Sequence, residues 1–136
     1  MLEILVIVVG VLVLGLLALR LKVGSVRRRH RRRIAATDPE HSAPANLVGV
    51  ASEGKAQVRG PGTLVLGRTD LVFVQLMPER EVVVPRDIIT STRTTRHFLG
   101  KTTGSDLLVV TWDRDGLTDA AAFAVQDLEV WRDRLA

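Results

Sequence analysis

The residues whose types and spacing come closest to a known chemical motif form a short string, Gly100-Lys101-Thr102-Thr103. The string matches the end of a Walker A loop, in which backbone N–H groups and a lysine bind nucleotide phosphates. That motif also needs a glycine five residues before its second glycine, where this chain has Thr95, and it needs a strand before it and a long helix after it. We therefore interpret the string as part of a glycine-containing loop between two strands, and expect no nucleotide cofactor.

Metal binding and acid–base catalysis find no better support. The histidines, His30, His41 and His97, stand in separate segments, and none has another ligand type at the spacing that metal sites use. The chain has no cysteine, which excludes disulfides, thiolate metal sites and a cysteine nucleophile. Asp113 and Asp115 fall in a tight turn, where short acidic residues are common. We expect solvated histidines, no metal, no cofactor and no enzymatic activity.

One further stretch, residues 92–101, combines cations with an apolar pair. Its candidate residues for contact with a lipid or a partner are Arg93, Arg96, His97, Phe98, Leu99 and Lys101. In one interpretation, the cations bind lipid headgroups while the apolar tip dips into the membrane interface. In the other, Phe98 packs into the domain and the cations are solvated. The exposure of Phe98 distinguishes the two, because a well exposed apolar side chain on a cationic loop favours docking.

The first element that positions these residues is an N-terminal membrane anchor. Residues 2–19 hold a single charge, on Glu3, and a helix of this length or slightly longer spans roughly 27 to 33 Å, close to the hydrocarbon thickness of a bilayer. A secretory signal peptide is a poorer match, because no cation precedes the apolar run, the run is too long and no small-residue cleavage site follows it. The sequence predicts an uncleaved, single transmembrane helix over residues 1–23.

Eight cations follow the apolar run and form a basic collar: Arg20, Lys22, Arg27, Arg28, Arg29, Arg31, Arg32 and Arg33. Cations beside a membrane segment stay on the cytoplasmic side, so the collar predicts a cell inner (plasma) membrane protein with its N-terminus outside and its C-terminal domain in the cytoplasm. The collar is expected to rest on anionic headgroups. Specific capture of a polyanionic lipid or of RNA is the alternative, but no aromatic side chain stands among the arginines to stack on bases.

The excess positive charge belongs to this anchor. Residues 1–46 hold eight Lys or Arg against three acidic residues, whereas residues 47–136 hold eleven against twelve. The folded part therefore has no positive field for nucleic acid, and the expected partners are the lipid bilayer and a membrane or envelope protein. Arginine outnumbers lysine 16 to 3, a bias common in proteins of GC-rich bacterial genomes. The sequence leaves the oligomeric state and the partner's identity open.

Residues 24–46 are interpreted as a basic juxtamembrane segment and linker. Within them, residues 35–46 contain two prolines and no apolar period, which predicts a flexible tether. From residue 47 apolar residues alternate, as in half-buried strands. The expected strands cover residues 48–58, interrupted at Gly54, then 63–66, 71–76, 81–84, 87–95, 107–112 and 120–125, with a loop over 96–105. A helix over residues 128–135 follows, capped by Asp127, with Trp131 as its core residue.

Several apolar motifs of this second part are spaced as in a known superfold. They are Gly62-Thr63-Leu64-Val65-Leu66, Leu71-Val72-Phe73, Val82-Val83-Val84-Pro85-Arg86-Asp87-Ile88, and Phe123-Ala124-Val125 ahead of the helix. The pattern resembles the PH-like superfold in its GRAM and bacterial PH forms over about residues 48–135. It departs at Gly67, where the family often has threonine.

The resemblance implies a mainly β domain over residues 47–136, with a seven-stranded bent sheet or barrel and one C-terminal helix. It also implies a non-enzymatic adaptor for lipids or proteins, and it assigns no ligand residues because PH-like domains share no common site. We therefore predict a membrane-tethered cytoplasmic binding or scaffolding module. It would recruit a membrane or envelope protein through an open sheet edge or the concave face of the barrel. The alternative is direct recognition of anionic lipid headgroups by the loop and the basic collar.

Overall fold

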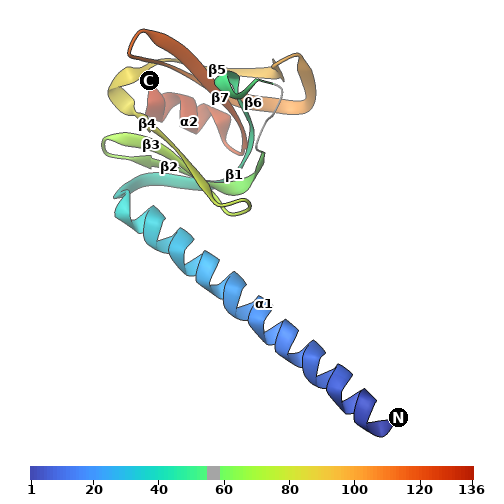
Figure 1. Cartoon of the computed structure of the whole chain (residues 1–136). Helices are drawn as coiled ribbons and strands as arrows, with labels where there is room; N and C mark the ends of the chain where they lie inside the picture. Colours follow the sequence, from blue (N-terminus) through green and yellow to red (C-terminus); the bar gives the residue numbers. More distant parts are fainter. Residues whose placement is uncertain (55–58) are drawn as a thin grey trace.

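The computed structural model describes residues 1–54 and 59–136, without the side chain of Lys101. In chain order the elements are α1 (Leu2–Ala36), β1 (Pro39–Val50), β2 (Gly60–Gly67), β3 (Asp70–Gln75), β4 (Arg80–Pro85), β5 (Ile89–Phe98), β6 (Lys101–Arg114), β7 (Leu117–Val125) and α2 (Leu128–Leu135), with short 3-10 helices at Ala51–Glu53 and Arg86–Ile88. Figure 1 shows α1 leading away from a small β domain, with α2 lying inside the bent sheet.

The strands form one antiparallel sheet in the order β4-β3-β2-β1-β7-β6-β5. β1 joins the two halves of this sheet, because residues 39–47 pair with β2 and residues 45–50 pair with β7. β4 and β5 stand at the two ends of the order, so the sheet is bent but not closed. The predicted class, a long apolar helix followed by a seven-stranded sheet and one C-terminal helix, is confirmed.

Alternation along the strands places the main core on one face of the sheet. In β6, Leu108, Val110 and Trp112 belong to that core. Leu107 and Val109 point to the opposite face, where they form a smaller buried cluster. The sequence shows this stretch as a continuous apolar run because β6 is covered on both faces.

Helix α2 covers the main core with Trp131, whose side chain is fully buried, as the sequence predicts. The ring centroid of Trp131 lies 4.7 Å from that of His41 in β1. Asp127 stands at the N-cap position, but its side chain makes no capping hydrogen bond. Its backbone carbonyl accepts hydrogen bonds from the N–H groups of Val130 and Trp131 instead. Asp127 therefore begins the helix through its left-handed backbone and not through its carboxylate.

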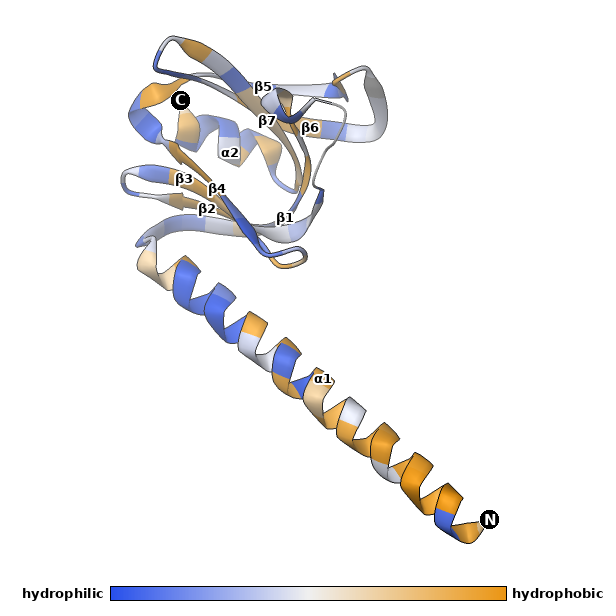
Figure 2. Cartoon of the chain, viewed as in Figure 1, coloured by the Kyte–Doolittle hydropathy of each residue, from blue (hydrophilic) through white to orange (hydrophobic). Residues whose placement is uncertain are grey.

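α1 is longer than the predicted anchor, and β1 takes most of the place of the predicted tether. It continues through the basic collar to Ala36, and Figure 2 shows the change from apolar to polar residues along it. The flexible tether expected over residues 35–46 is wrong, because β1 begins at Pro39 and pairs with β2 from there. Pro44 is compatible with this strand because β7 pairs only from Ala45 onward, so β1 has a single neighbour at Pro44.

The loop expected over residues 96–105 is also wrong. β5 continues to Phe98 and β6 begins at Lys101, which leaves only Leu99 and Gly100 between them. Both turn residues have positive φ angles, 52° and 74°, as a tight two-residue hairpin turn requires. The polar residues of this stretch resemble a loop in sequence but belong to a hairpin. The strand expected to continue over residues 56–58 lies outside the described residues.

Candidate functional site

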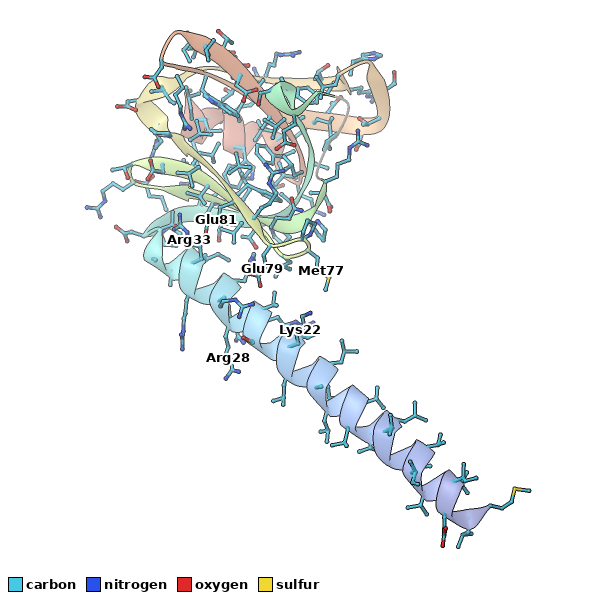
Figure 3. The ribbon with its side chains drawn as sticks, in the orientation of Figure 1. Lys22, Arg28, Arg33, Met77, Glu79 and Glu81 are labelled. Atoms are coloured by element: carbon cyan, nitrogen blue, oxygen red, sulfur yellow. The ribbon has the colours of Figure 1, made fainter. Side chains whose placement is uncertain are left out.

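Two ion pairs fix the C-terminal part of α1 to the β3–β4 hairpin. Arg29 Nη2 lies 2.7 Å from Glu79 Oε1, and Arg33 Nε lies 2.6 Å from Glu81 Oε1. Residues four apart on a helix rise by about 6 Å, and residues two apart at the start of a strand are separated by about 7 Å, so the two pairs match in spacing. Figure 3 shows Arg33 and Glu81 at this contact. We call the contact between residues 26–37 and the sheet the helix–sheet junction.

His30 faces the sheet between these two arginines. Its Nε2 lies 2.9 Å from Thr63 Oγ1, while its Nδ1 is buried and has no hydrogen-bond partner among the residues described. Burial removes water from the ring, and this desolvation lowers the pKa of His30 below its ordinary value of 6.5. The neutral imidazole is therefore the form that fits the helix–sheet junction.

The end of α1 approaches β2 closely at Gly67. A Cβ atom on Gly67 would lie 2.6 Å from the carbonyl oxygen of Thr37 and 2.8 Å from its Cγ2. Thr37 caps α1, and its hydroxyl donates a hydrogen bond of 3.0 Å to the carbonyl of Arg33. Glycine is needed here because a side chain would separate the helix end from the sheet.

A groove of about 530 Å³ remains between α1 and the β3–β4 hairpin. Its lining includes apolar Val26, Val74 and Leu76 together with the ion-paired side chains of the junction. Gln75, which is 1% exposed, lies on the sheet side of the groove and donates 3.4 Å hydrogen bonds to two backbone carbonyls. The groove is thus part of the helix–sheet junction. Arg29 and Arg33 in its lining are ion-paired, whereas Arg32 forms no ion pair with a described residue.

The structure divides the basic collar into two groups. Arg29 and Arg33 are paired with the sheet. The other six, which form no ion pair within residues 1–54 and 59–136, are Arg20, Lys22, Arg27, Arg28, Arg31 and Arg32. Arg28 points away from the sheet in Figure 3. Six cations of the collar therefore remain free to meet an anionic surface.

The second candidate region, residues 92–101, does not present an aromatic tip. Phe98 is only 7% exposed and packs with Leu107, Val109 and Ala122 in the smaller cluster. Leu99, in the turn, is the exposed apolar residue of the hairpin. The interpretation in which Phe98 packs into the domain is therefore the one that the structure supports.

The cations of this hairpin point to separate partners. Arg96 Nε lies 3.2 Å from Asp106 Oδ1 on β6, and His97 Nδ1 lies 2.9 Å from the hydroxyl of Thr102. Arg93 is exposed on β5. The side chain of Lys101 lies outside the described residues. Among the described side chains of this hairpin, Arg93 is thus the exposed arginine that forms no ion pair.

β5 presents an open sheet edge. β6 is its hydrogen-bonded neighbour on one side, and no described strand pairs with it on the other. Register shifts between Ile89 and Ser91 and between Thr95 and His97 enclose a regular stretch over residues 91–95. The other end strand, β4, is partly occupied, because Arg114 Nη2 donates a 3.0 Å hydrogen bond to the carbonyl of Val83. Of the two edges, β5 is the better template for a further strand.

Other chemistry gains no support from the arrangement. Among the described residues, no group of three His, Asp or Glu side chains is placed to hold a metal ion. The expectation of solvated histidines is wrong for His30 and His41, which are half-buried against Thr63 and Trp131. The Walker-like string continues from the turn into strand β6 and precedes no helix.

Comparison of the sequence with protein-family models and with curated proteins gives no match. The function must therefore be inferred from the arrangement of the chain itself. Within it, the features that sequence reasoning missed are the acidic pair Glu79 and Glu81 and the close approach at Gly67. The signal for the acidic pair is present, since Arg29 and Arg33 have the matching spacing, but nothing in the sequence marks the hairpin as their partner.

Proposed function

We propose that this chain is a membrane-anchored, PH-like binding module that holds a membrane or envelope protein at the cytoplasmic face of the inner (plasma) membrane. α1 is long and apolar enough to span a membrane. The cations that follow its apolar part favour a cytoplasmic domain. The bent sheet with its closing helix, together with the apolar motifs of the sequence, supports the PH-like assignment. The proposed role is non-enzymatic.

The observation that carries this proposal is the open edge of β5. A partner segment in an extended conformation adds to such an edge through main-chain hydrogen bonds, and side chains next to the edge select its sequence. Arg93 lies in the regular stretch over residues 91–95 and is exposed. The segment that fits best is therefore extended and carries an acidic residue opposite Arg93.

The helix–sheet junction gives this edge a fixed position. A flexible tether would let the domain reorient above the bilayer, and binding would then have to order it. The short connection from α1 to β1, the close approach of Thr37 to Gly67 and the ion pairs of Arg29 and Arg33 together favour one orientation of β5 relative to α1. A partner in the same membrane meets an edge that is already oriented, which lowers the entropic cost of association.

Site-specific photo-crosslinking in cells tests the proposal. A photoreactive amino acid at Ser91, which leaves Arg93 in place, should crosslink to one protein, and the crosslinked peptide should be an extended acidic segment. The same amino acid at Val83, on the partly occupied β4 edge, should not yield that adduct. Equal crosslinking from Val83, or adducts to many unrelated proteins, would overturn the β5 proposal. Periplasmic activity of a C-terminal reporter fusion would separately overturn the cytoplasmic placement.

Direct recognition of anionic lipid headgroups is a second candidate, favoured by the six collar cations without an ion pair in the described residues. In nanodiscs of mixed phosphatidylcholine and phosphatidylglycerol, the full chain should retain phosphatidylglycerol around α1. Replacing Arg27, Arg28, Arg31 and Arg32 with glutamine should abolish this enrichment. An unchanged lipid composition after these replacements would exclude the collar as the headgroup site.

A further inference from the structure

We propose that the turn between β3 and β4 is a second membrane contact, in which Met77 enters the interface of the bilayer that α1 spans. This inference rests on the proposed anchoring of α1 and adds a surface that the anchor alone does not require. Met77 is 68% exposed although it is a large apolar residue. In Figure 3 it points away from the sheet and toward the part of α1 that holds Lys22.

The ion pair between Arg29 and Glu79 sets the height of this turn along α1. The continuous apolar run of α1 ends at Leu19, and Leu21 is a further apolar residue after Arg20. Arg29 stands eight residues beyond Leu21, a rise of about 12 Å. The headgroup region of a bilayer adds roughly 5 to 8 Å on each side of the hydrocarbon core. Glu79 is therefore held just above the headgroups, and the turn that precedes it lies at their level.

Met77 is close enough to reach the boundary of the hydrocarbon. Met77 stands two positions before Glu79, with only Pro78 between them, and two residues of chain extend at most about 7 Å. In Figure 3 the turn points toward the N-terminal end of α1 and brings Met77 toward the part of the helix that holds Lys22. The flexible side chain of methionine extends this reach, and methionine adapts well to an irregular surface.

The positive charge of Lys22 on α1, near Met77, suits an anionic lipid surface. Lys22 precedes Arg29 by seven residues, two helical turns, so both lie on the face of α1 that meets the hairpin. Lys22 forms no ion pair with any described residue and stands one residue after Leu21. An ammonium at this height meets lipid phosphates, while the methionine beside it meets the acyl boundary. The occupant that fits this pair of groups is the bilayer itself.

Two membrane contacts would explain why the helix–sheet junction is built with ion pairs. A single helix lets a domain rotate and tilt above the bilayer, whereas a second contact on one side of α1 fixes the tilt. The junction transmits that constraint from Met77 to the whole sheet, because Glu79 and Glu81 stand only two and four positions after Met77. The contact thus orients the β5 edge relative to the membrane plane.

Spin labelling of the full chain in phosphatidylcholine–phosphatidylglycerol nanodiscs tests this contact. The chain has no native cysteine, so Met77→Cys, Leu117→Cys and Leu12→Cys each carry one nitroxide. Collisions with oxygen, which enters the bilayer, are compared with collisions with a water-soluble nickel chelate. Leu117 is the matched control, because it is 75% exposed and lies at the start of β7. Leu12 reports on the anchor.

We expect a high oxygen-to-nickel collision ratio at residue 12, an intermediate ratio at residue 77 and a low, water-like ratio at residue 117. A water-like ratio at residue 77 with residue 12 in the bilayer would overturn the second contact and leave the anchor intact. A water-like ratio at residue 12 would overturn both. As a check on the label, Glu79→Ala should release the turn and move the ratio at residue 77 toward that at residue 117.

Discussion

Replacing Gly67 with alanine should strain the helix–sheet junction. The added Cβ atom would lie 2.6 Å from the carbonyl oxygen of Thr37, closer than carbon and oxygen atoms approach without repulsion. Because the contact is with backbone, no flexible side chain can turn away, and either the end of α1 or strand β2 must move. Inserting one methyl group into such a packed contact costs about 1 to 3 kcal/mol.

Guanidinium unfolding of the full chain in detergent micelles measures this cost. Both tryptophans, Trp112 and Trp131, are buried in the β domain, so their emission follows its unfolding without a signal from α1. Gly104→Ala is the matched control, since its added Cβ atom meets nothing within 4 Å. We expect the control to change the unfolding free energy by less than about 0.5 kcal/mol.

The strain in Gly67→Ala has two routes of relief, and both are measurable. If β2 moves, the midpoint of unfolding falls. If α1 moves, the distance between α1 and the sheet changes, and spin labels on the two report it. A Gly67→Ala variant that matches Gly104→Ala in both measurements would refute the close approach of α1 to the sheet.

Three further changes test the core and the helix–sheet junction. Trp131→Ala should lower the unfolding free energy by about 3 to 5 kcal/mol, because the ring is fully buried, and Trp112 fluorescence measures it. A double-mutant cycle of Arg33→Ala and Glu81→Ala should give a coupling of about 0.2 to 1 kcal/mol, since both side chains are partly solvated. Acidification should destabilise the folded chain through His30, because burial lowers the pKa of His30 in the folded state. The unfolded chain then binds more protons than the folded chain, so the unfolding free energy falls as the pH drops from 6.5 toward the lowered pKa.

Each of these has a contradicting outcome. A small loss in Trp131→Ala would mean that α2 does not cover the core. Zero coupling in the cycle would mean that Arg33 and Glu81 act independently. His30→Gln should lose part of the acid sensitivity of the unfolding free energy, and identical pH profiles for both proteins would exclude His30 as its source.

The sheet and its core were predictable because burial leaves a clear pattern. Leu107, Val109 and their neighbours form a continuous apolar run that only a strand covered on both faces explains. Trp131 follows from its helical spacing with Leu128 and Leu135. In α2 the buried residues repeat with the helical period. In β6 the short length of the run and its β-branched residues indicate a strand.

The errors occurred where long-range pairing overrides local composition. Residues 39–46 contain Pro39 and Pro44 and look like a linker, yet the ladder with β2 holds them as a strand. Residues 96–105 are polar and glycine-containing, yet they pair across a two-residue turn. Hydrogen bonds between strands depend on what lies opposite in space, and a single sequence does not show this.

The collar shows the same limit at the candidate site. Its eight cations are visible in the sequence, but which of them are paired depends on the hairpin that meets α1. Arg29 and Arg33 find Glu79 and Glu81, fifty and forty-eight residues away, and the others do not. The sequence therefore located the charge correctly and missed its division into a structural pair and a free group.

Distance measurement between α1 and the sheet tests most directly whether the domain is fixed to its helix. Nitroxides at Arg28→Cys, on the face of α1 away from the sheet, and at Leu117→Cys, at the start of β7, stand at exposed positions that take no part in the two ion pairs. For the full chain in nanodiscs, pulsed double electron–electron resonance should give one narrow distance distribution, because the helix–sheet junction holds the two labels in one arrangement. A broad distribution, as a flexible tether produces, would contradict a fixed helix–sheet junction. It would also contradict the fixed orientation of the β5 edge and the contact at Met77.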